Sequence, residues 1–350
     1  MSGVILAYHR VAELDLDPQM LAVTPRNFDE HLQVIRSRFR PVSLRAASEL
    51  LADGGNLDGI VVLTFDDGYA DSLSQLAPLL ERYEVPATVF ATSGYVGGDR
   101  EFWWDELEQI LLGSPALPRE LGLTLRGGER RWDLGAAAVA SEEERAAWAD
   151  WTILAAGDPS PRHRAYRQLE SVFHRLRKEE QQRVLRGLRS WAGTDGTARE
   201  SHRVLTCDEV AELAVHPLVE LGAHTASHPV LARLTPAEQW LEIDGSKSEL
   251  ERIAGTPITS FAYPFGRRAW RHRLATMLQG PERYRADYTR QTARIVRYAG
   301  FERAVANFGG GLAPRSRAFE LPRVVVHDGS GDTLARVIEQ AGRSGRAVRR

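Results

Sequence analysis

Four residues of this chain combine the side-chain types and the spacing of a metal site with a base beside it. Asp66 and Asp67 are adjacent carboxylates, and His224 and His228 are imidazoles four positions apart. Two histidines and one carboxylate form the ligand set of a catalytic zinc site, which keeps one coordination position open for water or substrate. We therefore predict that Asp67, His224 and His228 hold zinc or a similar divalent ion.

The remaining aspartate supplies the base. A divalent ion lowers the pKa of a water that it binds to roughly 7, and a neighbouring carboxylate can accept the remaining proton. Asp66 is the predicted base. Because Asp-Asp-Gly also occurs as a turn that caps a following helix, the aspartate pair alone leaves a structural role open. The aspartate pair and the histidine pair together favour the catalytic interpretation.

Apolar strands precede both pairs. Residues 60–65 form a continuous, β-branched run closed by Gly68, and residues 218–223 end in the same way at His224. Such runs are typical of strands that are covered on both faces of a parallel sheet. The carboxyl ends of parallel strands form the mouth where chemistry is done, so both pairs should meet at one edge.

The order of strands and helices predicts a barrel interrupted by an insert. Strand-like and helix-like segments alternate through residues 1–101 and again through residues 204–340, as expected for parallel α/β folds. Residues 102–203 break this pattern with a predicted hairpin at a Gly-Gly turn and arginine-rich amphipathic helices. We predict a two-part barrel, a mainly helical insert and a basic, disordered tail over residues 341–350. The predicted strands of the barrel cover residues 4–9, 42–44, 60–65, 87–91, 219–223, 258–262, 304–306 and 324–326.

Composition excludes several classes of protein. The 350 residues include 45 Lys plus Arg against 47 Asp plus Glu, which gives a formal net charge of -2 and no basic field for nucleic acid. Cys207 is the single cysteine, so no intrachain disulfide forms. The sequence has no apolar run long enough for a transmembrane segment and opens on a strand rather than a leader. We therefore expect a cytoplasmic protein with no nucleic-acid partner.

Three motifs carry a family resemblance. They are Thr-Phe-Asp-Asp-Gly at residues 64–68, His-Thr-Ala-Ser-His at residues 224–228, and Phe-Ala-Tyr-Pro-Phe-Gly at residues 261–266. Together they resemble the first three motifs of the polysaccharide deacetylases with a NodB homology domain, carbohydrate esterase family 4. Weaker similarity extends the resemblance from about residue 4 to residue 340, except for much of the insert. The weaker segments are residues 8–11, 86–90, 103–107 and 299–301.

The resemblance implies a fold, an activity and roles for residues. The fold is a distorted (β/α) barrel, and the activity is metal-dependent removal of N-acetyl groups from acetamido sugars of a surface polysaccharide or its precursor. This is a hydrolase reaction on a carbon–nitrogen bond that is not a peptide bond. By motif position, Asp66 is the base, and Asp67, His224 and His228 are the metal ligands. The backbone N–H of Tyr263 is the implied oxyanion donor.

The chain departs from the family pattern in three places. The arginine that often precedes the tyrosine of the third motif is replaced by Thr259-Ser260-Phe261, which leaves the orientation of Asp66 open. The nearest counterpart of the family's Leu-x-His acid is Val325-Val326-His327, so His327 is the candidate general acid. The aspartate motif that precedes this acid has no clear match.

Other candidates concern binding of the carbohydrate substrate. His9 ends the first predicted strand and would face the same mouth, although a lone histidine is more often structural. Trp103 and Trp104 could each present a face to a sugar ring, or they could anchor the insert. With Tyr263, these residues are the predicted substrate contacts.

Three alternative functions remain open at this stage. The same metal machinery would hydrolyse a formamido sugar or a small ureide. Two histidines and a carboxylate also describe non-haem iron oxygenases, although those sites do not require a second aspartate. A carbohydrate-binding protein without catalysis is the third alternative, favoured by the missing arginine.

Overall fold

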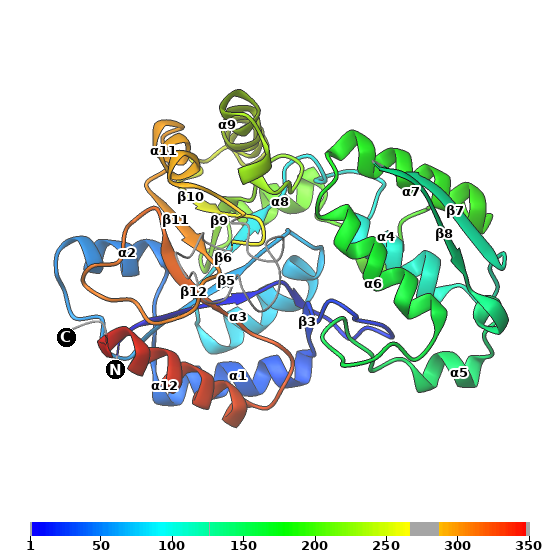
Figure 1. Cartoon of the computed structure of the whole chain (residues 1–350). Helices are drawn as coiled ribbons and strands as arrows, with labels where there is room; N and C mark the ends of the chain where they lie inside the picture. Colours follow the sequence, from blue (N-terminus) through cyan, green and yellow to red (C-terminus); the bar gives the residue numbers. More distant parts are fainter. Residues whose placement is uncertain (1, 126, 267–286, 348–350) are drawn as a thin grey trace. The chain divides into compact units, whose positions relative to one another are not determined.

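The chain divides into two compact units. The computed structural model describes residues 2–125, 127–266 and 287–347, which Figure 1 shows as ribbon. The first unit comprises Met1–Glu13, Ala22–Gly98 and Val204–Arg350, and the second comprises Leu14–Leu21 and Asp99–Arg203. The second unit therefore takes in a short segment, Leu14–Leu21, that we predicted as part of the barrel.

Seven parallel strands of the first unit close into a barrel-like sheet. The sheet closes because β1 pairs with β12 on one side and with β5 on the other. A short strand, β4 (Arg40–Pro41), pairs with the first residues of β5. The predicted α/β barrel is confirmed. In sheet order, the seven strands are β1 (Val4–Tyr8), β12 (Leu321–Val325), β11 (Arg303–Ala306), β10 (Ser260–Ala262), β9 (Val219–Ala223), β6 (Ala87–Ala91) and β5 (Ile60–Phe65).

Helices follow most of these strands and cover the sheet. In Figure 1, α1 and α12 lie side by side, and α9 packs between α8 and α11. A small parallel pair, β2 (Arg10–Val11) with β3 (Ala22–Val23), extends the chain beyond β1. The helices of the first unit are α1 (Pro25–Arg38), α2 (Leu44–Ala52), α3 (Ala77–Tyr83), α8 (Cys207–Ala214), α9 (Pro236–Ala254), α11 (Arg290–Tyr298) and α12 (Gly331–Ala347).

The apolar strand sequences account for the position of the core. Every residue of β1 and β5 is buried, as expected for strands covered on both faces. Tyr8 stacks on Phe65 with ring centroids 5.0 Å apart, and Phe28 of α1 meets both rings edge-on. This aromatic cluster fixes the two strands whose carboxyl ends lead into the predicted site.

The second unit contains the predicted hairpin and helices. Strands β7 (Glu120–Leu125) and β8 (Gly128–Asp133) form an antiparallel hairpin around the Gly-Gly turn, as the sequence predicted. Ser141 and Glu144 form a capping box at the start of α5. The helices of this unit are α4 (Trp103–Glu108), α5 (Glu142–Ala147), α6 (Pro161–Phe173) and α7 (Lys178–Ala192).

Two local predictions were wrong. Residues 42–44 are not a strand, because the pairing with β5 occurs at Arg40–Pro41 and α2 already begins at Leu44. Of the predicted disordered tail at 341–350, residues 341–347 continue α12, and residues 348–350 lie outside the described residues. The helix persists since Leu334, Ile338 and Ala341 recur at helical spacing and are buried. Among the described residues, no helix has the length and apolar character needed to cross a bilayer.

Candidate active site

The two pairs of predicted residues meet at the carboxyl ends of the barrel strands. Asp66 and Asp67 directly follow β5, and His224 directly follows β9. Asp67, Thr225 and His228 adopt positive φ angles of 74°, 67° and 56°, a backbone conformation that costs energy for non-glycine residues. Such strain clusters at functional sites, where the surrounding fold holds it in place.

Gly68 makes the turn after the aspartates possible. Its φ is 82°, and a Cβ atom added there would lie only 3.0 Å from the Cα of Ala91 on β6. Any larger residue would therefore push the aspartate pair away from the neighbouring strand.

Asp67, His224 and His228 form a buried cluster whose donor atoms fit one divalent ion. Oδ1 of Asp67 lies 3.6 Å from Nε2 of His224 and 3.4 Å from Nε2 of His228. Ligands that each lie about 2.0–2.2 Å from a common ion are separated by distances of this order. The His224 ring is oriented by a 2.9 Å contact between its Nδ1 and the carbonyl oxygen of Ala262, which leaves Nε2 for the ion.

Asp66 stands beside this cluster and is held by Arg323 from β12. The guanidinium donates to both carboxylate oxygens, Nη1 to Oδ1 at 2.7 Å and Nη2 to Oδ2 at 2.6 Å. Both side chains are fully buried. A bidentate pair of this kind fixes the plane of the carboxylate and leaves further lone pairs for an incoming proton.

The charge of Arg323 keeps Asp66 ionised. Burial acts to raise the pKa of the Asp66 carboxyl, but the attraction of Arg323, with a smaller effect of His224, lowers it to about 2. Asp66 is therefore a carboxylate across the neutral pH range.

Arg323 is the main functional residue that the motif analysis missed. It supplies the cation that the third motif lacks, from a different strand. Its Nε donates to Oδ1 of Asn307 at 2.9 Å and its Nη1 donates to Thr64 at 3.1 Å. Asn307, which follows β11, in turn donates its backbone N–H to the carbonyl oxygen of Gly266. The available sequence signal was an arginine inside the apolar run 321–326, since a buried charge requires a partner.

A second missed residue, Glu242 on α9, holds the loop that carries both histidine ligands. Its Oε2 accepts the backbone N–H groups of Ala226 at 3.0 Å and Ser227 at 2.8 Å. Its Oε1 accepts the Ser227 hydroxyl at 2.6 Å. Glu242 therefore fixes the loop between His224 and His228 without contacting the metal cluster.

Replacing Glu242 should loosen the metal site. Because three hydrogen bonds to the loop are lost, we expect Glu242→Ala to weaken zinc affinity by about 10- to 100-fold, the range typical of outer-shell partners. Competition with a fluorescent chelator measures this affinity. Glu249→Ala on the same helix, which loses only a surface pair with Arg252, is the matched control. Equal zinc affinities in the two variants would contradict the role of Glu242.

For Tyr263, the predicted role of its backbone N–H as oxyanion donor remains a prediction. Its backbone N–H donates to the carbonyl oxygen of Val305 at 3.2 Å, because β10 stays paired with β11 beyond its last strand residue. Its hydroxyl donates to Phe319, and its ring is buried against Tyr288. Two other residues of this motif contact the histidines of the cluster. The carbonyl oxygen of Ala262 contacts His224, and the ring centroid of Phe265 lies 4.7 Å from that of His228.

The two remaining histidine candidates follow strands at the same end of the barrel. His9 follows β1, and burial lowers the pKa of its imidazole to about 4 against the opposing effect of Asp66. His9 is therefore neutral at neutral pH. His327 lies shortly after β12, is exposed, and acts electrostatically on His9. The roles assigned to these two histidines remain predictions.

Trp103 and Trp104 belong to the core of the second unit. The Trp103 ring stacks on Phe173, and the Trp104 ring stacks on Phe102 with centroids 4.5 Å apart. Both rings are buried, which favours the alternative that they anchor the insert. Their predicted contact with a sugar remains a prediction.

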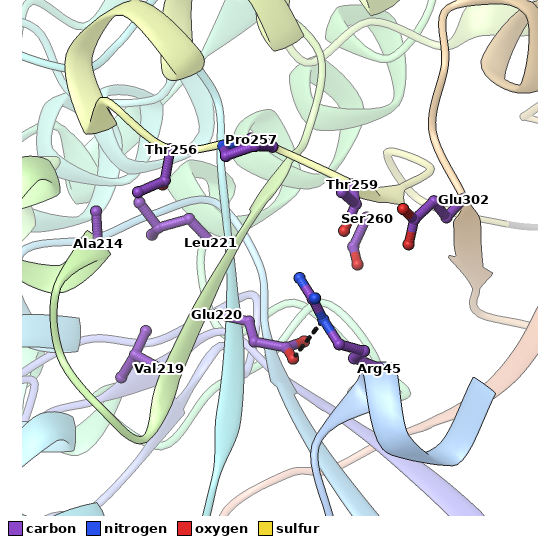
Figure 2. Close-up of a pocket in the computed structure, with 10 residues that line it drawn as sticks. All are labelled: Arg45, Ala214, Val219, Glu220, Leu221, Thr256, Pro257, Thr259, Ser260 and Glu302. Carbon is purple, nitrogen blue, oxygen red and sulfur yellow. Dashed lines mark ion pairs between the residues drawn. The ribbon is translucent and has the colours of Figure 1, made fainter. Parts of the chain in front are cut away.

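A cavity of about 440 Å³ lies at the opposite ends of the strands from the metal cluster. Figure 2 shows that Arg45 and Glu220 point toward one another across it, and they form an ion pair of 3.6 Å. Val219 begins β9 and Ser260 begins β10, so the cavity opens at the amino ends of the strands. This cavity is therefore not the substrate site of the metal cluster.

Comparison with known proteins places the fold and the motifs in one family. Residues 53–112 and 190–280 match the model of the family described as polysaccharide deacetylase. YxkH of Bacillus subtilis, whose name places it among the polysaccharide deacetylases, is 25% identical over 108 residues. That match covers 30% of this chain and only 37% of YxkH.

Solved structures share the fold over almost the whole chain. The deacetylase PplD of Streptococcus pyogenes, in complex with acetate, has a TM-score of 0.55 and 17% identity, and the match covers 97% of this chain and 98% of PplD. IcaB of Ammonifex degensii has a TM-score of 0.52 and 17% identity, with 97% of each chain covered. The polysaccharide deacetylase BC0361 of Bacillus cereus has a TM-score of 0.52 and 15% identity, covering 97% of this chain and 69% of BC0361.

Proposed function

Since the chain belongs to the polysaccharide deacetylase family, we propose that it hydrolyses the acetamido group of an N-acetylated sugar to a free amine and acetate. The substrate would be a surface polysaccharide or its precursor. The observation that carries this proposal is the pairing of a buried Asp-His-His cluster with an adjacent carboxylate held by arginine.

Zinc or a similar divalent ion is the proposed cofactor. Asp67, His224 and His228 would hold it, and their two imidazoles and one carboxylate match the donor preference of zinc. When bound, the ion would polarise the acetamido carbonyl and acidify the attacking water.

The chain's own residues would move the protons. Asp66 is ionised and fixed by Arg323, so it would accept the proton of the attacking water. The leaving amine needs a proton in the same reaction, and His327 is the proposed donor because it follows β12 at the same end of the barrel. Phe265 would shield the reacting group from bulk water beside His228.

Product analysis tests the proposal. Zinc-loaded protein should convert N-acetylated oligosaccharides into products in which one amine replaces an acetamide, with one acetate released per amine. Mass spectrometry and enzymatic acetate determination measure both products. The metal-stripped protein and the His228→Ala variant should release neither, because the ion or one of its ligands is missing.

Other outcomes distinguish the alternatives. The protein could release formate from formamido sugars or ammonia from ureides and release no acetate from any acetamido sugar. That result would make it a different amide hydrolase and would contradict the proposal. Saturable binding of the oligosaccharides without turnover at any pH or with any divalent ion would make the chain a carbohydrate-binding homologue.

A further inference from the structure

A second group of metal-ligating side chains lies inside the inserted unit. Asp105 and Glu108 are three residues apart on α4 and so project from the same side of the helix. His202 belongs to a short helical turn at Glu200–His202, almost a hundred positions later in the sequence. The three side chains are buried, and one donor atom from each lies within 4.8 Å of the others.

The geometry of this group repeats that of the barrel site. Nε2 of His202 lies 3.7 Å from Oε2 of Glu108, and the corresponding distances between Asp67 and its two histidines are 3.4 and 3.6 Å. These separations are too long for strong hydrogen bonds but fit two ligands of one ion. Both groups therefore place an imidazole and a carboxylate at the spacing that a shared cation requires.

Neighbouring residues orient the donor atoms of His202 and Glu108 by hydrogen bonds, as commonly happens around metal ligands. Nδ1 of His202 contacts the Ser201 hydroxyl at 2.9 Å, which directs Nε2 toward Glu108. The other oxygen of Glu108 accepts from Nη1 of Arg199 at 2.8 Å. Arg199 also donates to Glu101 and to the backbone carbonyl of Asp105, so one side chain braces α4 around the group.

The charges of this region favour a cation. Glu101, Asp105 and Glu108 are three buried carboxylates, and the guanidinium of Arg199 pairs with Glu101 and Glu108. A divalent ion would balance the carboxylate charge that a single guanidinium leaves uncompensated.

We propose that Asp105, Glu108 and His202 bind a divalent cation that stabilises the inserted unit. One imidazole and two carboxylates suit ions from manganese to zinc. Because all three ligands are buried and the group belongs to the insert, the role is structural and distinct from the proposed catalysis. The ion would couple α4 to the turn at Glu200–His202, which are the two ends of the insert.

Metal content tests the proposal in a background that lacks the barrel site. The full-length His224→Ala/His228→Ala variant, dialysed against zinc or manganese, should retain about one ion per chain. Adding His202→Ala should abolish this binding. Adding His174→Ala, which removes another histidine of the same unit that pairs with Glu170, should leave the content unchanged.

Thermal unfolding provides an independent readout. Zinc should raise the unfolding midpoint of the background variant and a chelator should reverse the shift, because a ligand that binds only the folded state stabilises it. Glu108→Gln keeps the size of the side chain and should remove the zinc response. It therefore tests the proposal even if His202→Ala does not fold.

Either of two results would overturn the proposal. The background variant could retain no ion and show no zinc-dependent shift, which would make the group an ion-pair network around Arg199. Alternatively, the His202→Ala and Glu108→Gln variants could bind as much metal as the background.

Discussion

Asp66→Asn is expected to retain its metal and to lose about 100- to 10,000-fold in kcat, the contribution typical of a general base. The amide keeps the shape of the carboxylate but cannot accept the proton of the attacking water. Asp66 does not belong to the metal cluster, so zinc content should stay at the wild-type level. Acetate release under saturating substrate and elemental analysis of the same preparation measure the two effects.

Asp67→Asn is the matched comparison, because it makes the same substitution at the neighbouring residue. It should lower both zinc content and rate, since Asp67 is a predicted ligand. Asp66→Asn also leaves the Arg323 guanidinium without its carboxylate, so the assay temperature must lie below the melting point of each variant. An Asp66→Asn protein with wild-type kcat would remove Asp66 from the role of base.

Arg323→Met should have the largest effect on stability and a large effect on rate. Removing one partner of a buried ion pair leaves an uncompensated charge and costs about 3–5 kcal/mol in the free energy of unfolding. The carboxylate of Asp66 also loses its orientation, for which we expect a fall in kcat of about a hundredfold. Urea unfolding and steady-state kinetics measure these effects.

Two further variants separate charge balance from catalysis. Arg303→Met removes another buried arginine, at the start of the neighbouring strand β11 and therefore at the opposite end of the barrel. It should lower stability but preserve kcat. The double variant Asp66→Asn/Arg323→Met removes both charges and should recover much of the stability lost in Arg323→Met while remaining inactive. Full activity in Arg323→Met would show that Asp66 needs no orienting cation.

The Arg323→Met substitution should shift the pH–rate profile in a defined direction. In the native protein, Arg323 lowers the pKa of Asp66, whereas burial alone would raise it. Without the guanidinium the burial effect prevails, so the acidic limb of the pH–rate profile should move to higher pH. In the native protein the Asp66–Arg323 pair should contribute its full stability above about pH 4 and lose it as the pH falls toward 2.

The sequence predicted those parts of the site that have local patterns. The apolar run that precedes Asp66 and Asp67 defines the carboxyl end of β5. The apolar run that precedes His224 defines the carboxyl end of β9 in the same way, and neither inference needs the fold. The barrel itself was predicted from the strand–helix alternation together with the family resemblance, but its seven-stranded closure is seen only in the structure. The patterns that place Asp66, Asp67 and His224 each lie within a few adjacent residues.

Residues that act through distant contacts were not predictable in the same way. Arg323 meets Asp66 across 257 positions of sequence, and the partner of a lone arginine in a strand depends on the register of β1, β5 and β12. The contact of the Tyr263 backbone N–H with Val305 was not predictable either, because the motif gives the residue types but not how far the pairing of β10 with β11 continues. Glu242 lies on an ordinary helix face, and only its position under the histidine loop reveals its role.

Anomalous diffraction at the zinc edge, from crystals of the zinc-loaded protein, would locate the ion itself. We expect a peak bounded by Oδ1 of Asp67 and the Nε2 atoms of His224 and His228. Asp66 should lie beside this peak, outside the ligand set and still paired with Arg323. A map with no peak at this position, or one in which Asp66 is the carboxylate ligand and Asp67 is not, would rule out the proposed division of roles between the two aspartates.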